Sequence, residues 1–216
     1  MQLLVLAEKT AKPIIEEIEK IVADIKKQGI TTQSDGRCIN VPSALTIGNS
    51  RSFIKYAKQT LQKVAENINI IFDKSYQGPH FHRIRDDFIK EFGSDFIVAK
   101  LLIDDQSWIK KIIELRNEDE HPNTGKPYCN NFDINKDKSG TFVITLPTFF
   151  EGTQIGNALE VYSHNLLTFA EEITVFSLEK FFPPIATIYE IPENERRPEL
   201  PTRFRIGLKT KINTTK

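Results

Sequence analysis

The sequence uses little cysteine and shows no excess of charge of either sign. Among its 216 residues only Cys38 and Cys129 are cysteines, which excludes a disulfide framework and a cysteine-based metal knuckle. Such sparse use of cysteine is typical of proteins from a reducing compartment. The 29 basic and 29 acidic residues cancel, so the overall composition does not indicate a nucleic-acid-binding protein.

Long hydrophobic runs are also missing. The apolar stretch within MQLLVLAEKT is short, has no basic leader and has no small-residue cleavage site. It therefore predicts neither a signal peptide nor a membrane span. No later stretch reaches membrane length, and the sequence has no internal repeat and no low-complexity tract. We expect a soluble, cytoplasmic protein that does not associate with membranes.

What the sequence does contain is helical periodicity. Apolar residues recur at helical spacing in several long segments, as in helices that bury one face. The predicted helices are 8–28, 50–73, 80–92, 95–117 and 152–182. Pro122 forbids continuation beyond the fourth of them. A chain of this length can bury a core without disulfides or metals, so we predict a mainly α protein, a helical bundle of four to five helices.

Short β-prone runs complete the predicted architecture. The predicted strands are Phe132–Asn135, Thr141–Leu146, Ile185–Ile191 and Arg203–Lys209. The first two are joined by the turn-rich residues 136–140 and are predicted to form a hairpin. Together these elements describe residues 1–216 as a single helical domain with a small β decoration. The decoration comprises a β-hairpin insert at 123–151 and a C-terminal β segment at 185–212.

One segment combines residue types that can perform chemistry. Arg116 is followed directly by Asn117, and four residues lie between Arg116 and His121. A guanidinium is a fixed fork of donors for phosphate oxygens, and an imidazole transfers protons near neutral pH. Such a pair could cleave RNA without a metal. His121 would take the proton from a ribose 2′-hydroxyl or give a proton to the leaving 5′-oxygen. Arg116 would stabilise the charge at phosphorus, and Asn117 would orient the pair or hold a phosphate oxygen.

Arg116, Asn117 and His121 together resemble the Arg-Asn-x-x-x-His motif of the HEPN family (higher eukaryotes and prokaryotes nucleotide-binding). Pro122 after the histidine is also similar to the family pattern, and the resemblance covers the bundle at roughly 50–182. It implies a HEPN-like fold and a homodimer in which two motifs face each other across a cleft. It also implies metal-independent endoribonuclease activity in the active members, often toxins or defence effectors. Other members are inactive binding or scaffold domains.

Two features depart from an active site of this kind. The acidic triplet at 118–120 fills the gap between Arg116 and His121 and competes with phosphate for the arginine. The insert at 123–151 separates the motif from the next helix, where it could form a lid or a partner surface.

Two hypotheses remain open. The first is an RNA-cleaving enzyme with an antitoxin or another partner protein, and the second is a non-catalytic dimeric interaction or scaffold protein on the same fold. A chance motif, with Arg116 ion-paired at an ordinary helix end, is the plain alternative.

Other motifs point to no metal and no cofactor. His80 and His82 alternate around a phenylalanine, but Asp86 is the one candidate for a third ligand nearby. Polar residues on the first turn of a helix are the favoured interpretation. The run that begins at Asp133 imitates a calcium-binding loop. It fails because Lys138 stands where the turn glycine is needed and Ile144 stands where the final glutamate is needed.

The C-terminal part of the sequence is basic. Residues 196–216 carry seven basic residues against one acidic residue. On a strand, one face would carry Arg203, Arg205, Lys209 and Lys211. The opposite face would carry Phe204, Ile206 and Leu208 and would pack on the bundle. The basic face is predicted to bind RNA along its phosphate backbone, and a basic edge strand that resists aggregation is an equal alternative.

Overall fold

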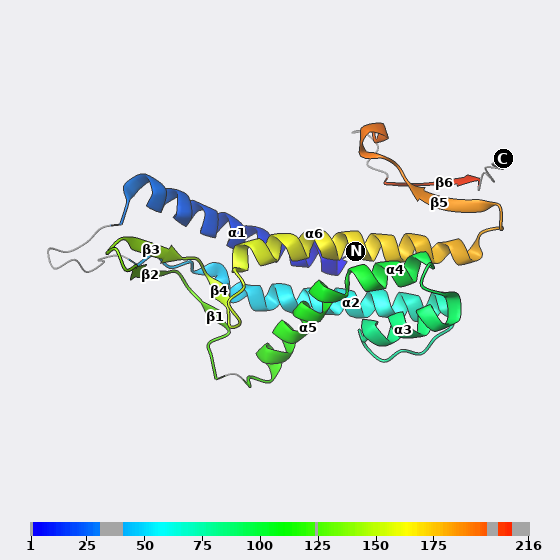
Figure 1. Cartoon of the computed structure of the whole chain (residues 1–216), viewed down its shortest axis with the longest axis horizontal. Coiled ribbons are helices and arrows are strands. Elements are labelled where there is room, and N and C mark those ends of the chain that lie inside the picture. The colour runs from blue at the N-terminus through cyan, green and yellow to red at the C-terminus, as the bar shows by residue number, and fades with distance from the viewer. Residues whose placement is uncertain (1, 31–40, 124, 198–202, 209–216) are drawn as a thin grey trace. The chain divides into compact units, whose positions relative to one another are not determined.

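The computed structural model describes residues 2–30, 41–123, 125–197 and 203–208. These residues are mainly helical, which confirms the predicted fold class (Figure 1). The α-helices are α1 (Gln2–Gln28), α2 (Ser50–Phe72), α3 (Phe81–Phe92), α4 (Ile97–Asp104), α5 (Gln106–Glu120) and α6 (Ile155–Ser177). The short 3₁₀-helices are η1 (Thr46–Asn49), η2 (Leu178–Phe181) and η3 (Glu193–Glu195). Among the described residues, no helix combines the length and the apolarity needed to cross a bilayer.

The β structure consists of three small antiparallel pairs in the described part of the chain. The strands are β1 (Cys129–Asn130), β2 (Asp133–Lys136), β3 (Phe142–Thr145), β4 (Thr148–Phe149), β5 (Ala186–Glu190) and β6 (Phe204–Leu208). β2 pairs with β3 as the predicted hairpin, and β5 pairs with β6. The pairing of β1 with β4 was not predicted, because two-residue strands leave no periodic signal in a sequence.

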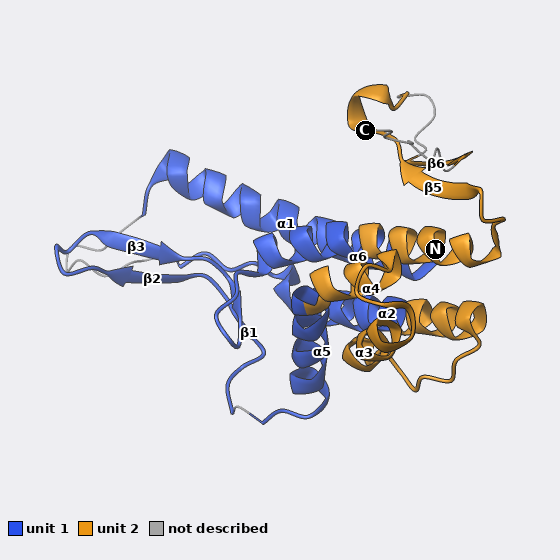
Figure 2. Cartoon of the chain, turned by 45° about the vertical axis from the view of Figure 1, so that its right-hand side comes forward, with its two compact units in different colours: residues 1–61, 107–167 blue, residues 62–106, 168–216 orange. Residues whose placement is uncertain are grey.

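The chain divides into two compact units (Figure 2). Unit 1 comprises residues 1–61 and 107–167, and unit 2 comprises residues 62–106 and 168–216. The division falls within α2, within α6 and at the joint between α4 and α5. The Arg116 motif belongs to unit 1 and the C-terminal basic segment belongs to unit 2.

The first helix begins earlier than the predicted residue 8. α1 begins at Gln2 because Ala7 and Ala11 continue the apolar stripe of Ile14 and Ile18 toward the N-terminus. These four residues are spaced four, three and four apart, so they lie on one helical face, and all are buried. Pro13 consequently lies inside the helix, and its exposed position lets the ring avoid the core.

The predicted helix at 95–117 is wrong as a single element, because it is two helices. α4 ends at Asp104, and the Asp105 N–H closes its last turn by donating to the Leu101 carbonyl at 3.0 Å. Aspartate side chains compete with the helical backbone for hydrogen bonds, so consecutive aspartates are a natural place for a break. The predicted helix at 152–182 is likewise shorter, since α6 ends at Ser177 and η2 follows it.

Unit 2 contains a cluster of four phenylalanines, of which Phe72 and Phe88 are buried. Phe72, Phe88, Phe92 and Phe96 contact one another with ring centroids 4.8 to 6.1 Å apart. Edge-to-face and tilted contacts of this kind contribute beyond the burial of their area. The cluster packs α3 against the end of α2. Phe88 and Phe92 are four positions apart in α3 and therefore lie on the same helical face.

Glu17 anchors the η1 segment to α1 inside unit 1. Its carboxylate accepts the backbone N–H groups of Leu45 at 2.9 Å and of Thr46 at 2.8 Å, and it also accepts the Thr46 hydroxyl. The Thr46 hydroxyl bond is the largest cause that holds the pKa of Glu17 below its ordinary value of 4.5, with partial burial opposing it and the two amides adding to it. The anchor therefore depends on the ionised carboxylate.

We expect Glu17→Gln to lower the free energy of unfolding by about 1 kcal/mol at pH 7, since it replaces an ionised acceptor by a neutral one. A lowered native pKa stabilises the fold fully above pH 4.5, and this contribution is lost as the pH falls through the lower native pKa. Urea denaturation at pH 7 and at pH 3 should therefore show a smaller difference between the two proteins in acid. An equal difference at both pH values would contradict this role of the carboxylate.

Candidate functional site

Arg116 is engaged by two carboxylates of its own helix. Its Nη1 lies 2.6 Å from Oδ2 of Asp119, and its Nη2 lies 2.7 Å from Oε1 of Glu120. Residues three and four positions apart lie on the same side of a helix, which is why both acids reach the same guanidinium. The Arg116 side chain is only 18% exposed, so its fork of donors is already occupied.

Two further cations from α2 complete this arrangement. Arg51 Nη1 lies 2.7 Å from the other oxygen of Asp119, and Lys58 Nζ lies 3.1 Å from the other oxygen of Glu120. We call Arg51, Lys58, Arg116, Asp119 and Glu120 the α2–α5 ion network. The hydrogen bond from Lys58, together with the charges of Lys58 and Arg116, lowers the pKa of Glu120. Each acid therefore joins the end of α5 to α2.

That cations of α2 take part in this network was not predicted from the sequence, although their spacing indicates a shared face. Arg51 and Lys58 are seven positions apart and therefore share one face of a helix. A basic face on one helix and an acidic triplet on another are complementary. The sequence does not say that these two helices are neighbours, and for that reason the network could not be derived from it.

Asn117 and His121 lie on the exposed side of the helix end. The backbone N–H of His121 donates to the Asn117 carbonyl at 2.8 Å, so His121 continues the last helical turn. Asn117 lines a hollow of about 330 Å³ together with Lys111, Glu114, Glu118 and Glu151, among others. Three carboxylates against one ammonium make this hollow unfavourable for a phosphate group.

The pKa of Tyr162 is raised by its surroundings, which include two glutamates of this hollow. Burial first, and then the charges of Glu151 and Glu114, raise the pKa of Tyr162 to about 12. Lys111 Nζ lies 3.3 Å from Glu151 and balances part of that negative charge. Tyr162 therefore stays protonated near neutral pH and does not act as a base.

The C-terminal arginines predicted to bind RNA also have acidic partners. Arg203 lies 2.7 Å from Glu171, 2.8 Å from Glu172 and 3.1 Å from Glu190, and its side chain is 23% exposed. Burial raises the pKa of Glu172, and the Arg203 hydrogen bond opposes that change. Arg203 thus ties the start of β6 to α6 within unit 2.

Arg205 is more accessible but is also occupied. It lies 3.4 Å from Glu195, and its guanidinium stacks 4.7 Å from the ring centroid of Tyr189. Lys209 and Lys211 lie outside the described residues. The described half of the predicted basic face is thus balanced by glutamates from the same unit.

The prediction that the apolar face of this segment packs on the bundle is wrong for two of its three residues. Phe204 contacts Phe176 of α6, with ring centroids 5.4 Å apart. Ile206 is 67% exposed and Leu208 is 72% exposed. The physical reason is that β5 supplies the buried residue of the pair, Ile188, while β6 is the outer strand.

Histidine and cysteine side chains are candidate metal ligands because these residue types bind metal ions most often. Among the described residues, no group of three or more histidine, cysteine, aspartate or glutamate side chains is placed to hold a metal ion. The rings of His80 and His82 are 6.0 Å apart at the start of α3. Cys129 is a free thiol, 3.3 Å from the hydroxyl of Ser50.

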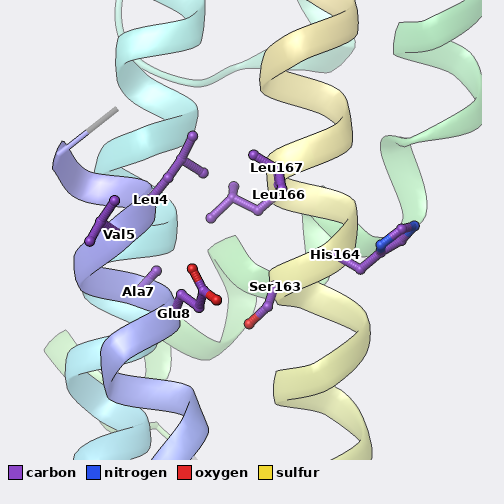
Figure 3. Close-up of a pocket in the computed structure, with 8 residues that line it drawn as sticks. All are labelled: Leu4, Val5, Ala7, Glu8, Ser163, His164, Leu166 and Leu167. Carbon is purple, nitrogen blue, oxygen red and sulfur yellow. The ribbon is translucent and has the colours of Figure 1, made fainter. Parts of the chain in front are cut away.

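An apolar groove of about 280 Å³ lies between α1 and the unit 1 part of α6 (Figure 3). Leu4 and Leu166 point toward each other across it, and His164 points away from it (Figure 3). Glu8 and Ser163 supply polar atoms at one end. Binding pockets fix a ligand through several converging polar groups, and this groove lacks such a set among its described lining.

Comparison of the chain with protein-family models, with curated proteins and with solved structures found no significant match. The resemblance of Arg116, Asn117 and His121 to the HEPN motif therefore stays a prediction.

Proposed function

We propose that this protein is a non-catalytic interaction protein, in which Arg116 stabilises the helical scaffold and binds no RNA. One observation carries the proposal: both ends of the Arg116 fork contact carboxylates, at 2.6 and 2.7 Å. A phosphate would have to displace two charged partners that are themselves held by Arg51 and Lys58. Breaking partly buried ion pairs is costly, and the neighbouring hollow is acidic.

A HEPN-like, metal-independent endoribonuclease is the second candidate. The observation that favours it is the turn held by the His121 N–H bond to the Asn117 carbonyl, which keeps both residues at the same helix end as Arg116. In that case a dimer partner, an antitoxin or the RNA itself would have to separate Arg116 from Asp119 and Glu120. His121 would then serve as the acid or base of RNA cleavage.

Two variants separate these functions. We expect Arg116→Ala to lower the free energy of unfolding by about 1–2 kcal/mol, because it removes two partly buried ion pairs. His121→Ala, at an exposed position, should change it by less than about 0.5 kcal/mol. Neither variant nor the wild type should cleave a mixed RNA pool in EDTA. Urea denaturation and gel analysis of the RNA give the two readouts.

Cleavage by the wild type that disappears in His121→Ala would overturn the proposal and establish the endoribonuclease. An unchanged stability of Arg116→Ala would also contradict it, because the arginine would then have no scaffold role. A lower stability of Arg116→Ala without RNA cleavage by any of the three proteins is the supporting result.

A further inference from the structure

The outer strand of the β5–β6 pair presents backbone groups that face away from its neighbour. The Ile191 N–H donates to the Arg203 carbonyl at 2.7 Å, which makes these residues a hydrogen-bonded pair at the end of the ladder. Hydrogen-bonded and non-hydrogen-bonded pairs alternate along antiparallel strands. The N–H and C=O groups of three β6 residues therefore point away from β5: Phe204, Ile206 and Leu208. In the described part of the chain β6 pairs with β5 alone.

This free edge is apolar. Ile206 and Leu208 are 67% and 72% exposed, and they lie on the same face of β6 as Phe204. Proteins usually protect an edge strand with charged residues, proline or a covering element. The one charged residue within β6 is Arg205, and Glu195 and Tyr189 already engage it. Within the described part of the chain, the edge thus carries open hydrogen-bonding groups beside exposed aliphatic side chains.

The strand is held in place before any partner arrives. Arg203 fixes the beginning of β6 to Glu171 and Glu172 of α6. Glu179 accepts the Ile188 N–H and the Thr187 hydroxyl, both at 2.6 Å, and so fixes β5. A strand that is already ordered loses little conformational entropy on binding, so this edge suits β-strand addition.

The sequence of β6 is complementary to itself. If two copies pair antiparallel about Ile206, each Ile206 faces its own counterpart and Phe204 faces Leu208. Arg205 then faces Gly207, which has no side chain and no charge, so no like charges stand opposite each other. The outward backbone groups of both strands meet as hydrogen-bonded pairs.

We propose that a second copy of this chain binds the free edge of β6, giving a symmetric four-stranded sheet across a two-fold axis. The proposal rests on the proposed function as an interaction protein and names its partner. Because each strand has only five residues, the dimer forms in a concentration-dependent way.

Disulfide trapping tests the register. In a Cys38→Ser, Cys129→Ser background, Ile206→Cys places the two introduced thiols on directly opposite residues, with Cα atoms about 5.5 Å apart. Leu208→Cys is the matched control, because each introduced thiol faces Phe204 and lies roughly 13 Å along the strand from its counterpart. We expect mild oxidation to give a covalent dimer with Ile206→Cys, at least about tenfold faster than with Leu208→Cys.

Sedimentation velocity tests the association itself. The wild type should dimerise at high concentration, and Ile206→Lys should raise the dissociation constant at least about tenfold by placing two ammonium groups opposite each other. Ile185→Lys is the matched control: Ile185 is also 65% exposed but precedes β5, so dimerisation should persist. Circular dichroism verifies that each variant is folded.

A wild type that stays monomeric up to about 1 mM would overturn the inference, as would equal cross-linking of the two cysteine variants. Neither result bears on Arg116, whose role is judged by the stability of Arg116→Ala and by RNA cleavage. A monomer in which Arg116→Ala is destabilised and RNA stays intact would remove the β6 dimer and leave the proposed function standing.

Discussion

Asp119→Ala is expected to lower the free energy of unfolding by about 2–3 kcal/mol. Asp119 is only 12% exposed and binds two arginines at once, Arg51 at 2.7 Å and Arg116 at 2.6 Å. Its removal takes one of two carboxylates away from Arg116, which is 18% exposed, and leaves it the Glu120 carboxylate at 2.7 Å. A largely buried cation that loses a partner costs more than a surface ion pair contributes. Arg116→Ala leaves Asp119 paired with Arg51 and Glu120 paired with Lys58, so the loss in Asp119→Ala should be the larger one.

The measurement is urea denaturation of Asp119→Ala beside Glu114→Ala at pH 7. Glu114 lies on the same helix and pairs with Lys110 at 3.7 Å, but both side chains are at least half exposed. Exposed pairs of this kind contribute at most about 1 kcal/mol, with a median nearer zero, so Glu114→Ala should be almost neutral. If the two variants lose the same stability, the α2–α5 ion network does not hold the end of α5.

Arg203→Ala should release the β5–β6 hairpin, reducing its local stability by about 2–3 kcal/mol. One guanidinium satisfies Glu171, Glu172 and Glu190, and Glu172 has a raised pKa because it is partly buried. Without the arginine, Glu171 and Glu172 lose the cation that they share and repel each other, while Glu190 keeps Arg196 at 2.7 Å. Hydrogen exchange at the Ile188 amide should accelerate by roughly 30- to 150-fold, which corresponds to that loss of local stability.

Two further variants sharpen this measurement. Arg205→Ala removes one pair in which both side chains are about half exposed, together with the stacking on Tyr189, and should accelerate exchange by less than about tenfold. Arg203→Lys should fall between wild type and Arg203→Ala, since one ammonium cannot serve three carboxylates as a planar fork does. Unchanged exchange in Arg203→Ala would show that other contacts hold the hairpin, among them those of Glu179 with Ile188 and of Phe176 with Phe204.

The arginines singled out as RNA-binding residues share one property. Arg116, Arg203 and Arg205 each have a carboxylate partner within 3.4 Å in the described structure. An arginine whose donors are occupied is available to phosphate only if those partners are displaced. The same residue types that attract phosphate also build ion pairs between helices and strands, and the sequence pattern is identical in the two cases.

Several parts of this protein were determined by the sequence alone, because they depend on neighbours along the chain. The apolar stripe of α2, the ends of α3 and the β2–β3 hairpin follow from helical periodicity and turn residues, and the structure confirms them. The competition of the acidic triplet at 118–120 for Arg116 was also foreseeable, since residues three and four positions apart share a helical face. The break at Asp105 was not predicted, because the helical periodicity of apolar residues is strong on both sides of it. The consecutive aspartates were the one local indication of a helix end.

Only the tertiary structure decided which side chains meet across distant segments. Arg51 and Lys58 reach the end of α5 because unit 1 places part of α2 beside it, and no local pattern encodes that neighbour. The exposure of Ile206 and Leu208 has the same origin: strand alternation assigns them to one face, whereas burial depends on what lies against that face. Periodicity is a property of the chain, while the partner of a charge or of an apolar face is set by the packing of whole elements.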